Sequence, residues 1–224
     1  MKYENIKKGK FIDRPNRFIA HVEIDGVVEI CHVKNTGRCK ELLVPKSTVF
    51  VQEFDSSKRK TKYDLISVYK GVRLINMDSQ VPNKVVAEFL PNIFDDIKHV
   101  KPESKYKNSR FDFYVETHND KIFIEVKGVT LENDGIVMFP DAPTERGIKH
   151  INELIECKKD GYLAYIIFVI QMDNVKYFTP NNVTHEAFGK ALKNAKEQGV
   201  QILAIDCNVT MDSINANDFI EVRI

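Results

Sequence analysis

The amino-acid sequence predicts two structural units: a small all-β barrel domain in residues 1–80, followed by an α/β domain with a mixed sheet in residues 81–224. Short alternating apolar segments separated by turn residues fill the first part, whereas helix-period and strand-period segments alternate in the second. The sign of the net charge changes at the same place: residues 1–80 carry 16 basic and 10 acidic side chains, whereas residues 81–224 carry 17 basic and 22 acidic ones. A chain of 224 residues is long enough for one large or two small domains.

The first domain contains five strand-like segments and no convincing helix-period segment. The segments are residues 17–24, 27–33, 48–54, 63–69 and 72–75, with a turn at Asp25-Gly26 between the first two. About five strands in this length are typical of a small barrel, and the oligonucleotide-binding (OB) barrel is the common intracellular example. The connecting loops would carry the NTGR segment at residues 35–38 and the basic run KRKTKY at residues 58–63.

The positive charge of this domain predicts a polyanion as its partner. The KRKTKY run ends in an aromatic residue, and this combination suits phosphate contact together with base stacking. A solvated hairpin tip would have the same composition, so both interpretations of this run stay open.

The second domain begins where the pattern changes near residue 80. Pro82 and Asn83 precede the segment KVVAEFL and Pro91 closes it, which predicts a short helix with Asn83 as its N-cap. The segments expected next are a strand near residues 97–100, a hairpin over residues 109–128 and a further segment at residues 135–139.

The remaining segments alternate between helix and strand. Thr144 is expected to cap a helix with one apolar stripe, and Gly161 ends that helix. Residues 162–172 form a continuous apolar run, which predicts a central strand covered on both faces. A helix over residues 185–198 then leads into a strand at residues 200–205.

The hairpin carries the most informative charges in the chain. If His118 and Asn119 form a two-residue turn, the numbers of paired residues sum to 237, which places Asp112 opposite Glu125. Like charges opposite each other destabilise a sheet unless a cation compensates, and carboxylate oxygens suit Mg²⁺ or Mn²⁺. Lys127 lies on the same face as Glu125 because side chains alternate along a strand. This combination indicates metal-assisted phosphodiester hydrolysis.

An alternative account of these charges stays open. An acidic residue two positions before a lysine occurs four times in the chain, about as often as chance predicts, but only Glu125/Lys127 lies within an apolar strand. Burying such charges costs several kcal/mol unless they are paired or bound to a metal ion. A structural ion pair with Arg110 is therefore the alternative to a catalytic site.

The order of elements resembles the core of the PD-(D/E)XK nucleases, and the whole chain resembles the sugar fermentation stimulation protein A (SfsA) family. The segments that carry this resemblance are RPNRFIAHV, HVKNTGRCKELLVP, VPNKVVAEFL, SRFDFYV, IFIEVKGVTL, MFPDAPTERGIKHINEL and FVIQMD. The resemblance implies an OB-like barrel, a PD-(D/E)XK nuclease-like α/β domain and DNA binding. It places the acidic ligand of these nucleases on Asp112, their second carboxylate on Glu125 and their lysine on Lys127.

Further residues enter by the same resemblance. Glu88 occupies the place of an additional acidic ligand in some nucleases, although an exposed helix charge is an equal account. Gln171 ends the central strand where related exonucleases keep a glutamine, and a satisfied strand-end amide is the alternative. In the segment that opens the long helix, Arg146 and the free N–H groups suit phosphate, and a simple capped helix is the alternative.

We therefore predict a metal-dependent nuclease that hydrolyses DNA or RNA. Mg²⁺ or Mn²⁺ would be bound by Asp112, Glu125, the carbonyl of Val126 and Glu88, with Lys127 orienting a water. The predicted nucleic-acid contacts are Arg17, Asn35, Thr36, Gly37, Arg38, Arg59, Arg110 and Arg146, and the predicted accessory residues are Asp141, Thr144, His150 and Gln171. The alternative function is a non-catalytic DNA-binding regulator of sugar-metabolism genes that retains a nuclease fold.

Composition narrows the class of protein further. No apolar run reaches the roughly 18 residues of a membrane span, and the charged start MKYENIKKGK lacks the apolar core of a secretory signal. A cytoplasmic location is expected. The four cysteines have no paired short spacing, which argues against a zinc site and for reduced thiols. The sequence does not specify an oligomeric state.

Overall fold

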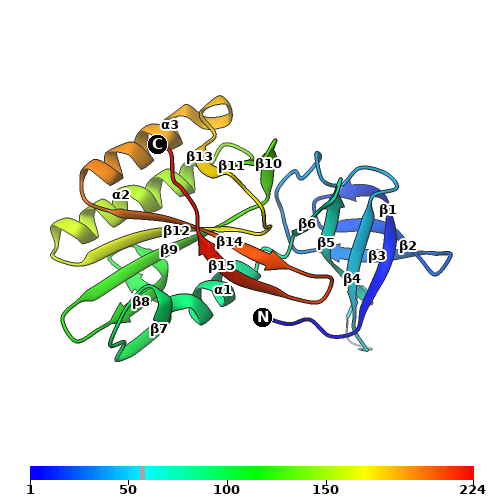
Figure 1. Ribbon diagram of the computed structural model, residues 1–224, viewed down its shortest axis with the longest axis horizontal. Coiled ribbons are helices and arrows are strands. Elements are labelled where there is room, and N and C mark those ends of the chain that lie inside the picture. The colour runs from blue at the N-terminus through cyan, green and yellow to red at the C-terminus, as the bar shows by residue number, and fades with distance from the viewer. Residues whose placement is uncertain (56–58) are drawn as a thin grey trace.

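A computed structural model describes residues 1–55 and 59–224 of the chain (Figure 1). Five strands form a closed barrel: β1 (Ile6–Asn16), β2 (Ile19–Ile24), β3 (Val27–Val33), β4 (Thr48–Glu53) and β5 (Tyr63–Lys70). They pair in the order β3-β2-β1-β4-β5, and a parallel pairing of β3 with β5 closes the barrel. A short strand, β6 (Arg73–Asn76), pairs with β5 outside this closure. The predicted all-β barrel is confirmed.

Strand β1 was not predicted from the sequence. Its residues IKKGKFIDRPN contain few β-branched or aromatic side chains and include Pro15. Gly9 approaches β2 so closely that a Cβ atom there would lie 2.5 Å from Cγ1 of Val22. Strand β1 therefore depends on its pairing with β2 and β4 rather than on local propensity.

The second domain is built on a six-stranded mixed sheet with the order β15-β14-β12-β9-β8-β7. Its strands are β7 (His99–Tyr106), β8 (Ser109–Glu116), β9 (Lys121–Val129), β12 (Leu163–Ile170), β14 (Gln201–Val209) and β15 (Ile214–Phe219). The central strands β9, β12 and β14 are parallel, and the outer strands pair antiparallel. A separate small sheet joins β10 (Leu131–Asn133), β11 (Ile136–Phe139) and β13 (Tyr177–Pro180).

Helices cover both faces of the large sheet, as predicted for the continuously apolar strand β12 (Figure 1). On one face, Ile166 and Phe168 belong to a hydrophobic cluster with α2 (Glu145–Lys159) and α3 (Asn182–Glu197). On the other face, Ile167 and Val169 belong to a cluster with α1 (Val81–Phe89), which a 3-10 turn (Leu90–Asn92) follows. Burial on both sides explains why β12 has no polar alternation.

Several sequence-based assignments need correction. Helix α1 begins at Val81 after Gln80, so Asn83 lies inside the helix and is not its N-cap. The strand predicted near residues 97–100 is β7, which begins at His99 and extends to Tyr106. Most of its residues are exposed, so its sequence shows little apolar alternation. Helix α3 begins at Asn182 with a break at His185. Strands β10, β13 and β15 were not predicted, because short or mostly exposed strands show weak periodicity.

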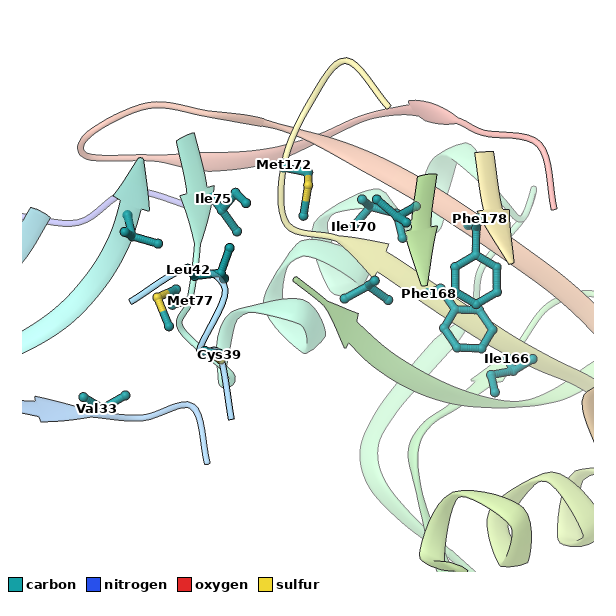
Figure 2. Packing of buried hydrophobic residues seen from close by; sticks show 14 of the residues in the cluster. Val33, Cys39, Leu42, Ile75, Met77, Ile166, Phe168, Ile170, Met172 and Phe178 are labelled. Atoms are coloured by element: carbon teal, nitrogen blue, oxygen red, sulfur yellow. The ribbon is translucent and has the colours of Figure 1, made fainter. Parts of the chain in front are cut away.

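A continuous hydrophobic cluster joins the barrel to the α/β domain (Figure 2). Ile75 and Met77 lie on the barrel side, and Ile170 and Met172 lie on the other side, all of them buried. The backbone N–H of Asn76 donates to the carbonyl of Gln171 at 2.9 Å. The two domains therefore share one core rather than a solvated linker.

A buried carboxylate adds a polar contact at the same junction. Glu132, at 6% exposure, pairs through Oε2 with Lys70 at 2.8 Å and through Oε1 with Arg73 at 2.6 Å. Both cations come from the barrel domain. Arg73 also donates to the carbonyl of Asn174 at 2.8 Å.

The first residues of the chain lie against the α/β domain rather than in the barrel. Tyr3 is buried in the cluster that contains α1, and Lys2 forms an isolated β-bridge with Ser213. The four cysteines are all buried and free. Across the part of the chain that the structure describes, no helix is both long and apolar enough to cross a membrane.

Candidate active site

Strands β8 and β9 pair in the register that the sequence predicts. Phe113 lies opposite Ile124, and the numbers of paired residues sum to 237. Asp112 and Glu125 are the next residues along the two strands. The backbone N–H of Val126 donates to Oδ2 of Asp112 at 2.7 Å, so the Asp112 carboxylate lies against the β9 backbone. The hairpin therefore brings the two predicted carboxylates together.

Glu125 is buried, and its two carboxylate oxygens have different surroundings. Nδ1 of His150 lies 2.5 Å from Oε1, and Nζ of Lys127 contacts the same oxygen. Oε2 is buried and has no hydrogen-bond partner among the described residues. Burial alone would raise the pKa of Glu125, but the hydrogen bond from His150 and the charge of Lys127 outweigh it and hold that pKa below its ordinary value. Glu125 is therefore a carboxylate with one free oxygen.

Asp112 has the opposite electrostatic character. Burial and the neighbouring charge of Glu125 raise the pKa of Asp112 above its ordinary value, against the hydrogen bonds from Val126 and Asn83. The side chain of Asn83 donates to Oδ1 of Asp112 at 2.8 Å. Asn83 was predicted to be the helix N-cap, so its contact with Asp112 was not expected from the sequence. The segment VPNK carries no signal that separates the two roles, because the helix start must be known first.

The donor set fits a hard divalent cation. The buried Glu125 and the half-buried Asp112 carry their carboxylates side by side, Oε2 of Glu125 has no hydrogen-bond partner among the described residues, and the Val126 carbonyl lies between Glu125 and Lys127 in the chain. Among residues 1–55 and 59–224, no group of three or more His, Cys, Asp or Glu side chains is placed so that it could hold a metal ion. Such an ion would therefore take one or two carboxylates, a main-chain oxygen and water, which is how Mg²⁺ is ordinarily held in proteins.

Three other predicted residues lie elsewhere. Glu88 is exposed and bonds the amino group of Met1 at 3.0 Å, as in the helix-charge alternative. Gln171 is buried and donates through Nε2 to Oδ1 of Asn76 at 3.0 Å, as in the satisfied-amide alternative, while its Oε1 lies against Gly128, where a Cβ atom would be 2.6 Å from it. Arg110 is exposed and lies 3.5 Å from Glu103, so the alternative ion pair between Arg110 and the hairpin charges is not observed.

The NTGR loop at residues 35–38 lies against the segment that precedes α2. The backbone N–H of Arg38 donates to Oδ2 of Asp141 at 3.2 Å. Gly37 packs closely there, because a Cβ atom would lie 2.5 Å from the same Asp141 oxygen, and a larger residue would displace that side chain. Asp141 therefore connects the barrel loop to the start of α2.

Helix α2 begins as predicted. Oγ1 of Thr144 accepts a hydrogen bond from the backbone N–H of Gly147 at 3.0 Å, which caps the helix. Arg146 is exposed in the first turn. His150, one turn further on, is buried and makes the contact with Glu125.

The second basic loop is described only in part, because Lys58 lies outside the described residues. Arg59 pairs with buried Asp64 and stacks on Phe54, with its guanidinium carbon 3.8 Å from the ring centroid. Its charge is therefore engaged within the barrel domain, and the structure does not present it as a free phosphate contact.

The fold and site define a two-domain protein in which a closed barrel precedes an α/β domain with a buried glutamate next to a half-buried aspartate. The model of the SfsA N-terminal OB domain matches residues 12–77, and that of the "Sugar fermentation stimulation protein RE domain" matches residues 80–213. The chain belongs to the sugar fermentation stimulation protein (SfsA) family, and its barrel is an OB domain.

Relatives agree over the full length of the chain. A sugar fermentation stimulation protein homolog from Clostridium beijerinckii is 67% identical over 99% of both chains. A homolog from Desulfitobacterium hafniense is 63% identical over 100% of this chain and 99% of its own. The structure of Pyrococcus furiosus SfsA in complex with Ca²⁺ is 28% identical, covers 100% of this chain and 98% of its own, and has a TM-score of 0.88.

Proposed function

We propose that this protein is a metal-dependent nuclease that hydrolyses phosphodiester bonds of DNA or RNA. The observation that carries the proposal is the unpartnered, buried Oε2 of Glu125 next to Asp112 and Lys127. A buried carboxylate oxygen without a donor is costly, and a divalent cation would satisfy it. The P. furiosus relative was solved in complex with Ca²⁺, which supports binding of a divalent cation by this chain.

The residues that would hold Mg²⁺ or Mn²⁺ are Asp112, Glu125 and the Val126 carbonyl. The ion would supply charge neutralisation at phosphorus and a lower water pKa. Asn83 and the Val126 N–H orient Asp112, and His150 and Lys127 turn Glu125 so that Oε2 stays available.

Other charged groups would act on the substrate. The ammonium of Lys127, partly exposed beside Glu125, would position an attacking water by hydrogen bonding. Arg146, exposed in the first turn of α2, would bind a phosphate oxygen. The OB domain, with 16 basic and 10 acidic side chains in residues 1–80, would hold the strand.

The direct test incubates the purified protein with single- and double-stranded DNA and RNA in the presence of Mg²⁺, Mn²⁺ or EDTA. We expect products that depend on the metal ion. Asp112→Ala or Lys127→Ala is expected to abolish cleavage and leave nucleic-acid binding nearly intact, because neither side chain lies in the barrel.

Lys121→Ala is the matched control, since it removes an exposed lysine from the same hairpin, at the start of β9 and four residues before Glu125. Equal cleavage by wild type and Lys127→Ala would remove the proposed site. A salt-sensitive mobility shift with no products under any metal condition would indicate a DNA-binding regulator instead.

A further inference from the structure

A pocket of about 500 Å³ lies between the barrel loops and the segment that precedes α2. We call it the NTGR pocket; its walls include Arg14, Arg17, Arg38, Lys40, Leu43 and Ala142. Its volume is within the range of small-molecule sites, about 300–1,000 Å³. None of its lining residues is acidic, so the pocket favours an anionic ligand.

Arg14 organises this pocket from inside. Its Nη1 donates to the carbonyls of Gly37 at 2.9 Å and Arg38 at 3.0 Å, and its Nη2 donates to those of Arg17 and Asn35, both at 2.7 Å. One guanidinium therefore pins two loops that are distant in sequence. The pocket is preformed, which lowers the entropy cost of binding.

The other three cations remain available for a ligand. Among the described residues, the side chains of Arg17, Arg38 and Lys40 have no hydrogen-bond or ion-pair partner, and all three are exposed. Two carboxylates lie beside this loop: Asp141 accepts a hydrogen bond from the Arg38 backbone, and exposed Glu41 follows Lys40 in the chain. These cations would bind phosphate oxygens, while Leu43 and Ala142 provide an apolar wall.

The pocket also lies close to the carboxylate site. Asn35 and Asp141, which support the NTGR loop, line a cavity of about 50 Å³ together with Gly128 and Val129. Gly128 directly follows Lys127. The NTGR loop and the carboxylate-bearing strand β9 therefore line one cavity, so a nucleic acid bound at the carboxylates would lie next to this loop.

We propose that the NTGR pocket binds one unpaired nucleotide of a single-stranded nucleic acid, with its phosphate against Arg17, Arg38 and Lys40 and its base against Leu43 and Ala142. A base inside a duplex cannot enter a concave site of this kind without leaving its stack, whereas an unpaired base can. The choice of a nucleic acid as ligand rests on the proposed function; the pocket itself does not depend on cleavage.

The test measures binding in EDTA, where cleavage is excluded, by fluorescence anisotropy with a single strand of about 12 nucleotides and with the matching duplex. Arg38→Ala is expected to weaken single-strand binding about fivefold and to reduce the salt slope by about 0.7. Ala142→Phe fills the apolar wall without a charge change, so affinity should fall while the salt slope stays constant. Lys121→Ala, which removes one exposed positive charge outside the pocket, is the control.

Two results would overturn the proposal. One is single-strand binding by Arg38→Ala and Ala142→Phe that equals that of wild type. The other is an equal loss for single strand and duplex, which would indicate general electrostatic attraction without entry of a base. Binding and cleavage are measured separately. If the protein binds a single strand through this pocket but never cleaves it, the proposed nuclease function is wrong and the proposed role of the pocket is supported.

Discussion

At the scale of single residues, the contacts of Glu125 decide what the site can do. Lys127 and His150 both approach Oε1, and Oε2 is left buried without a donor. An unsatisfied buried acceptor costs about 1–3 kcal/mol, so any cation that reaches it stabilises the folded state. The free energy released on metal binding is therefore measurable without an activity assay.

The first prediction concerns this oxygen. Mg²⁺, Mn²⁺ or Ca²⁺ at about 100 times its dissociation constant should add about 2.7 kcal/mol to the free energy of unfolding and raise Tm by several degrees. Glu125→Gln should remove most of that rise in differential scanning fluorimetry. Glu103→Gln, which removes an exposed carboxylate near Arg110, is the control. An identical rise in Glu125→Gln would place the ion elsewhere.

The second prediction concerns Asn83. Its hydrogen bond lowers the pKa of Asp112, so Asn83→Ala should raise that pKa further. Because a metal ligand must be ionised, the metal-induced rise in Tm should then be lost at a higher pH than in wild type. Gln80→Ala is the control at the start of the same helix, where no side-chain cap bond exists. Unchanged pH dependence in Asn83→Ala would show that Asn83 only packs.

At the scale of elements, helix α2 connects the NTGR loop to the carboxylates. Asp141 accepts from the Arg38 backbone just before the helix, and His150 reaches Glu125 from its second turn. The Thr144 cap fixes where the helix begins. Glu145 in the first turn and Lys158 and Lys159 in the last turn complement the helix dipole. The position of His150 therefore depends on the cap.

The third prediction follows from that cap. Thr144→Ala should lower the free energy of unfolding by about 1 kcal/mol and Tm by about 2–4 °C, because the Gly147 N–H loses its partner. Thr144→Ser keeps the hydroxyl and should retain most of the stability. Thermal unfolding monitored by circular dichroism compares the three proteins. Equal Tm values for the Ala and Ser variants would contradict a capping role.

At the scale of the whole molecule, the barrel and the α/β domain are held as one body. The shared hydrophobic cluster (Figure 2) excludes water at the junction. Glu132 is paired there with Lys70 and Arg73. Burial alone would raise the pKa of Glu132, but the hydrogen bonds from Lys70, the Gly135 N–H and Arg73 lower it below its ordinary value of 4.5. The position of the NTGR loop beside Gly128 requires this rigid junction.

The fourth prediction is a pH dependence of the junction. A carboxylate whose pKa is lowered by folding stabilises the native state above about 4.5, and this contribution is lost as the pH falls through the folded-state pKa. Tm of the wild type should therefore fall more steeply from pH 5 to lower pH than Tm of Glu132→Gln. At pH 7 the variant should be less stable by about 1–3 kcal/mol, because Lys70 and Arg73 lose their partner. If Tm fell with pH equally in the two proteins, ionised Glu132 would not contribute to the stability of the folded state.

Local patterns in the sequence determined much of this molecule. The hairpin register, the Thr144 cap, the central strand β12 and strands β2 to β6 were predictable, because alternation and capping are encoded within a few neighbouring residues. Exposed edges such as β7 and β15, and the charged strand β1, were not predictable, since pairing with a neighbour rather than propensity forms them.

The contacts between residues of the candidate site are decided by the tertiary structure. Asp112, Glu125 and Lys127 were identifiable on one hairpin, but Asn83, His150 and the NTGR loop reach that region from other elements. The resemblance to nucleases predicted Glu88 as a metal ligand, but its side chain instead accepts a hydrogen bond from the amino group of Met1. Sequence spacing specifies which residues share a face of one element; only the packing of helices and domains on the sheet decides which side chains from distant segments meet at Glu125 and leave one of its oxygens free.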